Sequence, residues 1–558
     1  MNRQRLLLAL AAVAVAFAAA DTYVVVLALP DMMITVGLGV DQLQRAAPIV
    51  SGFLLGYVAM LPLIGRIADL RGRVPVLIAA LLIFAFGSLV TALAFDLTSI
   101  VAGRFLQGMG GGGLVPATLA LVADLYPTER RAVPLGVVSA VQEVGSVLGP
   151  LYGALVLAVA DWETIFWINL AVGLVLAAAI AKLSGQPRTT RRIDWVGLAL
   201  LTVATALLIV MLWEPEALVT DVDLGLPFVP LIGQSRWLAP LSLIAVGCVA
   251  AFVWHASRTP HPLIDVRSWS ASLRAADPLG AALLGLGLGA VIIAFASADP
   301  AVQVFSPIAG WLLAGAVVAF VLFVLHVRRA KNPLVPSAAV RERPAWGSLF
   351  VSFFVGSALI AALVDIPVYA RLTTYRTSQL MAALVLVRLL AALPVGAVVG
   401  GFLTRRFTAG PVAAAGMALA AAGFTWMTTW DAHSLESWTS TLPLVLTGFG
   451  FGIALAPVNA ALLASTPNDV HGVASALVVV ARMCGMLIGI SALTTIGMRR
   501  FYQAVAHMSV IDAGVEQVHA VFIGAAICAA VAALGAVVLF RGADTRGQDT
   551  AQVLHTAG

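Results

Sequence analysis

The sequence contains little charge. Only 11% of its 558 residues are Asp, Glu, Lys or Arg, whereas 61% are apolar, and the mean hydropathy is +1.01. A soluble protein of this size would carry about a quarter charged residues. The low charge therefore excludes a soluble globular protein. Apolar runs of about 20 residues, each long enough to cross a bilayer, indicate an all-α polytopic membrane protein.

Cysteine is scarce, and no grouping of reactive side chains is visible. Cys248, Cys484 and Cys528 all lie inside apolar runs, so they imply no disulfide framework. The eight histidines form no metal-binding pattern. Gly110 to Gly113 resembles a phosphate-binding loop but lacks the Lys-Ser/Thr that should follow it. We therefore expect no enzymatic activity, no metal and no cofactor apart from a proton gradient.

The net charge of +5 would suit a nucleic-acid partner, but the positions of the charges indicate a membrane topology instead. Most of the 32 lysine and arginine residues fall in the loops on one side of the predicted spans, which by the positive-inside rule is the cytoplasmic side. Both termini would lie there. The first run, Leu6 to Ala20, continues to Pro30 and is longer than a signal-peptide core, so we interpret it as a retained span of an inner-membrane protein.

The apolar runs predict about sixteen spans in a six, four, six order. A polar, basic stretch from Lys182 to Arg192 is the first clear break. We therefore divide the chain into an amino-terminal six-helix bundle (1–185), a linker with two transmembrane hairpins (186–340), a carboxy-terminal six-helix bundle (341–541) and a cytoplasmic tail (542–558). Both hairpins are expected to be peripheral.

The linker contains an internal repeat. Asp194 and Gly197 open one hairpin, which closes with His255-x2-Arg258-x3-Pro262-Leu263. The same signals recur as Asp277, Gly280 and His326-x2-Arg329-x3-Pro333-Leu334. A tandem duplication is the simplest interpretation, although chance similarity between apolar hairpins stays open.

Two further helices give expectations about length. The fourth span is expected to open at Arg104 and to end near Leu125. The fifth span of the carboxy-terminal bundle is expected at Gly472 to Gly497. The stretch that follows, from Met498 to Gln517, is too polar to be inserted in the membrane. We expect that helix to continue through this stretch as a protruding amphipathic segment, and the last span to begin at Val518.

One apolar run carries a carboxylate, Glu143. An ionised group at a helix centre costs about 2.5–3.5 kcal/mol in hydrocarbon, so it is normally paired, solvated in a cavity or titrating. Gly145, Gly149 and Gly153 follow at intervals of four and allow another helix backbone to approach closely. Pro150 removes a backbone donor on the same helix.

Several motifs, taken together, resemble the major facilitator superfamily. They are Gly65-x3-Asp69-x2-Gly72-Arg73, Arg104-x2-Gln107-Gly108, Gly145-x3-Gly149-Pro150-x2-Gly153, Asp21-Thr-Tyr-Val-Val-Val-x3-Pro30, Trp162-x3-Phe166-x2-Asn169 and Arg482-Met-Cys-Gly485-x3-Gly489. The set is similar to the drug:proton antiporter branch that has extra helices between its halves. Within it, both six-helix halves most resemble the mycobacterial exporters of triacylglycerols and drugs that work with a lipid-binding lipoprotein. The chain departs from them at Glu163, where Arg is common, and in its second hairpin.

The resemblance implies two bundles that rock about a cavity lined by helices 1, 4, 7 and 10. Asp21 and Asp365 occupy similar places in the two halves, and either could couple protonation to shape. The alternative is that each is a water-exposed residue at a helix end.

Glu143 and Arg482 fall at comparable points of the two halves and could form an interface lock, with Arg388 as a competing partner for Glu143. A static buried ion pair is the alternative.

Two further groups of residues are given roles on the cytoplasmic side and inside the first bundle. Gly65, Asp69, Gly72 and Arg73 are interpreted as a cytoplasmic latch, against a simple topology-setting charge. Arg104 and Gln107 are expected to brace the amino-terminal bundle, and Arg104 could also sense the protonation of Asp21.

These patterns predict a proton-coupled secondary transporter that exports a hydrophobic or amphiphilic compound. A lipid such as triacylglycerol and a drug are both possible substrates. The alternatives are a multidrug:proton antiporter with no lipid role and, from another class, a non-transporting membrane scaffold or sensor. Membrane lipids and a lipid-binding lipoprotein are the expected partners, and no nucleic acid is expected.

Overall fold

The computed structural model describes residues 3–39, 42–125, 132–184, 194–221, 225–231, 235–296, 306–330, 333–335, 340–376, 378–467 and 471–543. For a few residues inside helices, Glu143 among them, only the backbone belongs to this description. The described residues are helical and contain no strand, which confirms the predicted fold class.

The long helices fall into three groups along the chain. The first group is α1 (Arg3–Thr35), α2 (Leu43–Arg71), α3 (Arg73–Ala92), α4 (Leu97–Leu125), α5 (Ala132–Leu157) and α6 (Glu163–Ser184). The second is α7 (Trp195–Trp213), α8 (Glu216–Val219), α9 (Pro240–Arg258), α10 (Val266–Ala275), α11 (Pro278–Ala296) and α12 (Ala309–Arg329). The third is α13 (Arg343–Leu372), α14 (Gln379–Arg406), α15 (Ala409–Met427), α16 (Thr441–Ala464), α17 (His471–Val505) and α18 (Val510–Leu539). Short 3-10 turns lie at Leu226–Phe228, Arg236–Leu238, Ser434–Glu436 and Trp438–Ser440.

Fourteen helices of the described residues are long and apolar enough to cross a membrane. Two further apolar stretches, Arg45–Leu61 in α2 and Val144–Leu157 in α5, are shorter. Fourteen of the sixteen predicted spans coincide with helices that meet this criterion, and the other two coincide with α2 and α5. The fourth span was placed too late, because α4 begins at Leu97 and not at Arg104.

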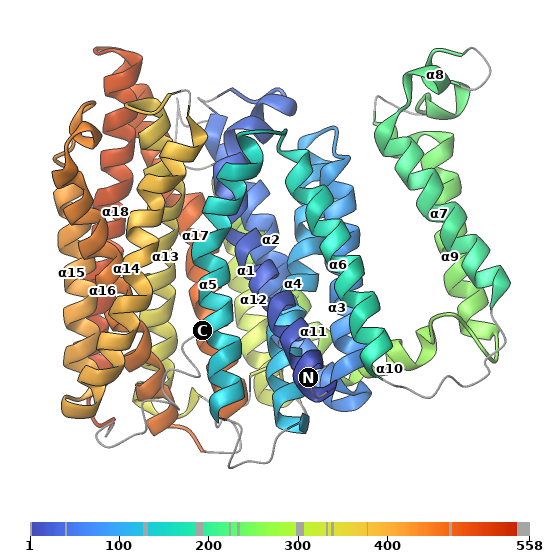
Figure 1. The fold of residues 1–558 in the computed structure, drawn as a ribbon, viewed down its shortest axis with the longest axis horizontal. Coiled ribbons are helices and arrows are strands. Elements are labelled where there is room, and N and C mark those ends of the chain that lie inside the picture. The colour runs from blue at the N-terminus through green and yellow to red at the C-terminus, as the bar shows by residue number, and fades with distance from the viewer. Residues whose placement is uncertain are drawn as a thin grey trace.

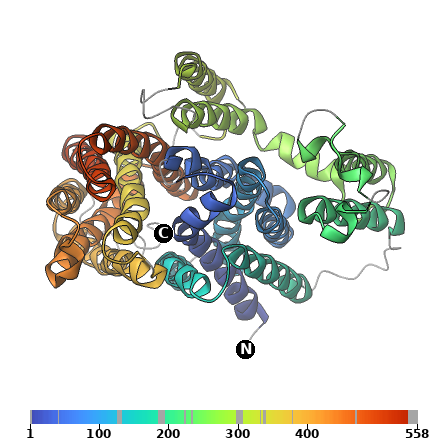
Figure 2. The same cartoon turned by 90° about the horizontal axis from the view of Figure 1, so that it is seen from above.

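The first and third groups form two bundles that stand side by side (Figures 1 and 2). The bundles meet where α2 packs on α17, α5 on α14 and α1 on α13. The first predicted boundary, at residue 185, falls outside the described residues, as does most of the predicted tail. The division of the chain at these boundaries stays a prediction.

The α1–α5 contact depends on small residues. Gly145, Gly149 and Gly153 face Ala16, Ala20 and Val24 of α1 at equal spacing, so the two backbones lie close together. A Cβ atom at Gly149 would lie 2.5 Å from the carbonyl oxygen of Ala20, which is closer than real Cβ contacts allow. The three glycines therefore set the distance between α1 and α5.

A polar network centred on Asp194 closes the first linker hairpin. Asp194 accepts hydrogen bonds from the N–H of Gly197 at 2.8 Å and of Leu263 at 3.0 Å, and it lies 2.8 Å from Nε2 of His255. The hydrogen bond from Gly197 and those from His255 and Leu263 lower the pKa of the Asp194 carboxyl.

The second hairpin repeats these contacts at equivalent positions. Asp277 accepts from Gly280 at 3.0 Å and from Leu334 at 2.9 Å, and it lies 2.6 Å from Nε2 of His326. Both copies thus cap the first helix of a hairpin and fasten the second helix to it, although tandem duplication as their origin stays a prediction.

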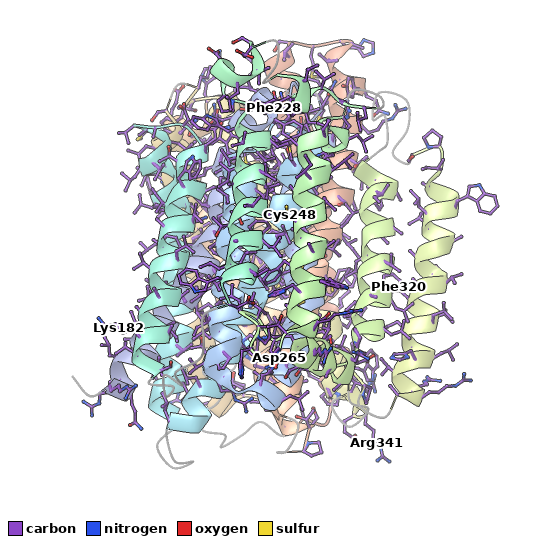
Figure 3. The ribbon with its side chains drawn as sticks, turned by 90° about the vertical axis from the view of Figure 1, so that its right-hand side faces the viewer. Lys182, Phe228, Cys248, Asp265, Phe320 and Arg341 are labelled. Atoms are coloured by element: carbon purple, nitrogen blue, oxygen red, sulfur yellow. The ribbon has the colours of Figure 1, made fainter. Side chains whose placement is uncertain are left out.

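The hairpins differ in what they pack against. The α7–α9 hairpin stands at the edge of the molecule, where Arg236 lies 4.3 Å above the ring of Phe95 (Figures 1 and 3). In the second hairpin α12 is exposed along most of its length, but α11 buries Leu288 and Ile292 and packs against both α2 and α17. The expectation that both hairpins are peripheral is therefore wrong for α11, whose apolar face covers the seam between the bundles.

Helices α17 and α18 extend beyond the other helices of the two bundles on the side opposite the N-terminus (Figure 1). Helix α17 continues to Val505, as predicted for its first part. The prediction is wrong for the rest of the stretch to Gln517, because α18 already begins at Val510. Arg500 and Glu516 form an ion pair at 3.1 Å between the two extensions, so a helical hairpin protrudes here.

We predict that Gly149→Ala lowers the thermal stability of the purified protein, because the new Cβ atom overlaps the α1 backbone. Overpacking of this kind costs about 1–3 kcal/mol. Gly247→Ala in α9 is the matched control, since nothing lies within 4 Å of its Cβ position. It should leave the unfolding midpoint unchanged or raise it. Thermal unfolding in detergent checks both variants, and equal midpoints would contradict the proposed role of Gly149.

Candidate functional site

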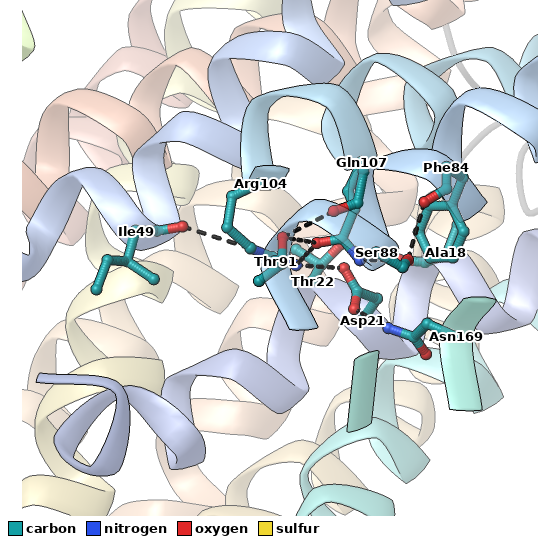
Figure 4. Close-up of polar contacts among 11 residues, drawn as sticks. Ala18, Asp21, Thr22, Ile49, Phe84, Ser88, Thr91, Arg104, Gln107 and Asn169 are labelled. Atoms are coloured by element: carbon teal, nitrogen blue, oxygen red, sulfur yellow. Dashed lines mark hydrogen bonds and ion pairs between the residues drawn. The ribbon is translucent and has the colours of Figure 1, made fainter. Parts of the chain in front are cut away.

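Asp21 lies in the middle of the first bundle with both carboxylate oxygens engaged. Its Oδ2 accepts a hydrogen bond from Nη1 of Arg104 at 2.5 Å, and its Oδ1 accepts one from Nδ2 of Asn169 at 2.5 Å (Figure 4). The side chains of Asp21 and Arg104 are both inaccessible to solvent. The ion pair joins α1 to α4, and the hydrogen bond from Asn169 joins α6 to both.

Arg104 extends the network to α2. Its Nη1 also donates to Oε1 of Gln107 at 2.9 Å, and its Nε donates to the carbonyl oxygen of Ile49 in α2 at 3.4 Å. Its guanidinium lies 4.5 Å from the ring centre of Phe53, which covers one face of the cation. Arg104 thus bonds to residues of α1, α2 and α4, as a residue that braces the bundle would.

Gln107 connects this centre to α3. Its Nε2 donates to Oγ of Ser88 at 2.8 Å, and Ser88 donates to the carbonyl oxygen of Phe84 at 2.8 Å (Figure 4). Because polar groups in hydrocarbon must find partners within the protein, such a chain fixes how neighbouring helices meet. Arg104 contacts Asp21 directly, so the hypothesis that it senses the charge of Asp21 is geometrically possible.

A small central cavity of about 40 Å³ lies between the two bundles. The helices predicted to line it, α1, α4, α13 and α16, all contribute. Helices α2, α5, α14 and α17 line it as well. The lining is mostly apolar and aromatic: Val15, Ala18, Ala19, Thr22, Tyr23, Tyr57, Val115, Gln142, Ser146, Val355, Leu359, Leu393, Phe451, Leu455, Arg482 and Met483.

Arg482 is the charged member of this lining. It projects from α17, is 9% exposed, and also borders a smaller cavity beside Asn459 inside the second bundle. Among the described residues no carboxylate forms an ion pair with it.

The predicted partners of Arg482 can be placed only in part. Glu143 belongs to α5, next to the cavity-lining Gln142, but its side chain lies outside the described residues. The lock between Glu143 and Arg482 therefore stays a prediction. Arg388 in α14 donates to Oγ1 of Thr441 at 3.0 Å, so in this conformation it bonds within its own bundle.

Asp365 is buried in α13, two residues before Pro367. Its Oδ1 has no hydrogen-bond partner among the described residues, and no described cation pairs with it. Neither Asp21 nor Asp365 is among the residues that line the central cavity. The expectation that either is a water-exposed residue at a helix end does not fit their burial.

The predicted latch residues surround a one-residue turn between α2 and α3. Gly72 adopts φ 87°, a value that favours glycine, and its N–H donates to the carbonyl oxygen of Ala68 at 3.0 Å. Arg73 begins α3. For Gly65 and Asp69 only the backbone is described. A latch role for the four residues stays a prediction.

Two contacts were not foreseen from the sequence. Asn169 was noted only as part of a motif, although an amide inside an apolar helix signals a buried partner. Asp31 was not noted, yet its Oδ2 accepts from Nε2 of Gln379 at 2.6 Å, and Arg371 lies 3.9 Å from its Oδ1. This Asp31 clasp joins the bundles on the side opposite the N-terminus.

Within the described residues no group of three or more potential metal ligands occurs.

We predict that Asp21→Asn destabilises the protein strongly, because it leaves the charge of Arg104 buried without compensation. Breaking a buried pair in this way costs about 3–5 kcal/mol. The double variant Asp21→Asn, Arg104→Gln should recover part of the loss, since both charges are gone. Arg500→Gln removes one partner of the exposed pair with Glu516 and should cost at most about 1 kcal/mol. A thermal midpoint of Asp21→Asn no lower than that of Arg500→Gln would show that the buried pair is not needed for stability.

Comparison with known proteins identifies the family. The model of the Major Facilitator Superfamily matches residues 11–490. The triacylglyceride transporter of Mycobacteroides abscessus is 36% identical over 501 residues, which cover 88% of this chain and 82% of that protein. The triacylglyceride transporter of Mycobacterium tuberculosis is 34% identical over 523 residues, which cover 91% of this chain and 85% of that protein.

Solved structures agree on the fold. An inward-facing bacterial homologue of the human lysosomal transporter Spinster has a TM-score of 0.57 at 14% identity, covering 98% of this chain and 99% of that one. An autoinhibited POT-family peptide transporter has a TM-score of 0.55 at 16% identity, covering 98% and 99%. The central cavity between two six-helix bundles and the family match lead to the same conclusion: this chain is a multi-pass membrane transporter that belongs to the Major Facilitator Superfamily.

Proposed function

We propose that this transporter exports a neutral or weakly polar lipid of the triacylglycerol class, with proton entry as the driving force. The observation that carries the proposal is the central cavity, which both bundles line mainly with apolar side chains. Because each wall belongs to a different bundle, rocking of the bundles would expose the cavity to one side of the membrane and then to the other. The names of the mycobacterial relatives support the lipid class.

General multidrug:proton antiport without a lipid role is the second candidate. Tyr23, Tyr57 and Phe451 line the cavity, and aromatic faces attract lipophilic cations. Arg482 opposes this, because its positive charge lies on the same wall and would repel such a ligand. An ester carbonyl, in contrast, can accept hydrogen bonds from a guanidinium group. The cavity therefore favours an ester lipid over a cationic drug.

We assign proton binding to the second bundle. Asp21 already has a cation and an amide as partners, whereas Asp365 is buried with an unsatisfied oxygen and has no cation beside it among the described residues. A carboxyl group in such a place is expected to exchange its charge for a proton. Glu143 and Arg482 would act as the interface lock, with Glu143 as a further proton site on α5.

The alternation would open and close contacts on opposite sides of the membrane. The Asp31 clasp joins the bundles on the side opposite the N-terminus, and it must break when the cavity opens there. We place the protein in the plasma membrane with both termini in the cytoplasm, so that the clasp and the protruding α17–α18 hairpin face outward. A lipid-binding lipoprotein that accepts the substrate would meet this outer face.

Proton coupling is tested in inverted membrane vesicles that are energised to an acidic interior, with a short-chain triacylglycerol as the probe and ethidium for comparison. Addition of the triacylglycerol should dissipate the gradient in vesicles with the wild-type protein, whereas ethidium should not. Asp365→Asn and Glu143→Gln should abolish the response, because neither amide can bind the proton. Glu342→Gln, at the exposed start of the same helix as Asp365, is the control and should respond like wild type. Normal dissipation by Asp365→Asn would exclude that residue as the proton site.

Lipid transport is tested with a cavity-filling variant, Leu359→Trp. The larger ring should lower both the triacylglycerol that co-purifies with the protein and the transfer of a fluorescent triacylglycerol between proteoliposomes and acceptor vesicles. Leu286→Trp is the matched control, since Leu286 is 66% exposed on α11, away from the cavity. Thermal unfolding of both variants separates loss of transport from overpacking, which costs about 1–3 kcal/mol. If the wild-type protein transferred triacylglycerol no faster than protein-free liposomes, and ethidium dissipated the proton gradient, the multidrug alternative would be favoured.

A further inference from the structure

Helix α10 differs from the spanning helices in its direction. It connects α9 to α11 and lies crosswise to them, at the level where the spanning helices end on the N-terminal side (Figure 1). Asp265, which precedes α10, lies at the same end of the molecule as Lys182 and Arg341 (Figure 3). With ten residues, α10 is too short to cross a bilayer, and its place corresponds to the interface between headgroups and acyl chains.

The residues of α10 divide into two faces. Val266, Trp269 and Leu273 lie three and four residues apart and form an apolar stripe. Arg267 and Arg274 are seven residues apart, so they lie almost above one another, on a second face about 100° around the helix from the stripe. Both arginines are exposed, as is Leu273, whereas Trp269 is half-buried. This pattern is typical of a helix that lies in the plane of a membrane interface.

Contacts with α2 hold α10 in this position. The guanidinium of Arg71 lies 4.6 Å from the centre of the Trp269 ring, and its Nη2 donates to the carbonyl oxygen of Asp265 at 3.5 Å. The carboxylate of Asp265 accepts a hydrogen bond from the N–H of Ser268 at 3.1 Å and so caps the helix. Helix α10 is therefore fixed beside Gly72, at the turn between α2 and α3.

The basic face of α10 has no described counter-charge. Arg274 donates to the carbonyl oxygen and to Oγ of Ser270, both at 3.3 Å, and neither Arg267 nor Arg274 forms an ion pair with a described carboxylate. Arg258, at the adjoining end of α9, adds a third exposed cation. The acidic residue between them, Asp265, is engaged as the helix cap.

We propose that the basic face of α10 is a docking surface for the phosphate-bearing headgroups of anionic phospholipids in the leaflet on the N-terminal side. Arg267 and Arg274 supply the charge, and the apolar stripe rests on the acyl chains and on α2. A basic residue near such a surface strengthens binding by about fivefold. Because Arg71 connects α10 to the turn at Gly72, a lipid bound here holds the linker against the moving end of α2. This inference does not depend on the proposed substrate.

Photo-crosslinking of the full-length protein in nanodiscs tests the proposal. The probe is phosphatidylglycerol with a photoactivatable acyl chain, in a phosphatidylcholine bilayer, and phosphatidylcholine with the same acyl chain serves as the reference. Mass spectrometry should locate phosphatidylglycerol preferentially on residues 266–275. The double variant Arg267→Gln, Arg274→Gln should reduce the preference at least about tenfold, and high salt should weaken it.

Control variants distinguish charge from folding. Arg267→Lys, Arg274→Lys keeps both charges and should retain the preference. Arg343→Gln, Arg406→Gln removes two exposed arginines at the same level of α13 and α14 and should leave it unchanged. Equal labelling of α10 by both lipids, or an unchanged preference in the glutamine variant of α10, would overturn the proposal. The proposal would also be overturned if phosphate buffer abolished the labelling and a chloride buffer of equal ionic strength did not. That result would indicate a site for free phosphate.

Discussion

The buried pair of Asp21 and Arg104 sets the form of the first bundle, because hydrocarbon tolerates ionised groups only when the protein itself compensates them. Through Asn169, Gln107 and the carbonyl oxygen of Ile49, this one pair reaches α1, α2, α3, α4 and α6. The second bundle is built differently: Asp365 and Arg482 are both buried, but no described ion pair joins them to a partner. The buried pair of the first bundle is thus neutral and braced, whereas the buried charged residues of the second bundle have no described ion-pair partner.

Glycine contacts explain how the two bundles can move as units. Gly145 in α5 meets the backbone of α1 at Ala16, and Gly485 in α17 meets the backbone of α13 at Phe353. Both bundles therefore use a close helix pair of the same kind, and Glu143 and Arg482 lie just before the glycines of their pairs. This correspondence places the two residues of the predicted lock on rigid helix pairs. Movement of one bundle against the other would then change the distance between them without deforming either bundle.

The sequence was sufficient for the helices and for part of the candidate site. Apolar runs located each span, because bilayer thickness fixes span length, and the Asp194 and Asp277 signals located two polar networks of equal geometry. Helix ends were less predictable: α18 begins at Val510 because polar residues outside the hydrocarbon can stay helical. The Asp31 contact with Gln379 joins residues 348 positions apart, and local patterns contain no information about such a pair. The contributions of α5 and α17 to the cavity also depend on packing that no single helix determines.

The linker shows how one repeated hairpin can acquire two different settings. Both copies are closed by the same contacts of Asp, Gly and His, so their internal fold does not depend on neighbours. The copy formed by α7 and α9 touches the body mainly near its ends, whereas α11 rests on α2 and α17 and therefore on both bundles. Its contact surface contains Leu288 and Ile292, and apolar contacts have no fixed direction, unlike hydrogen bonds. Such a surface lets α11 pack on both bundles without a directed bond to either.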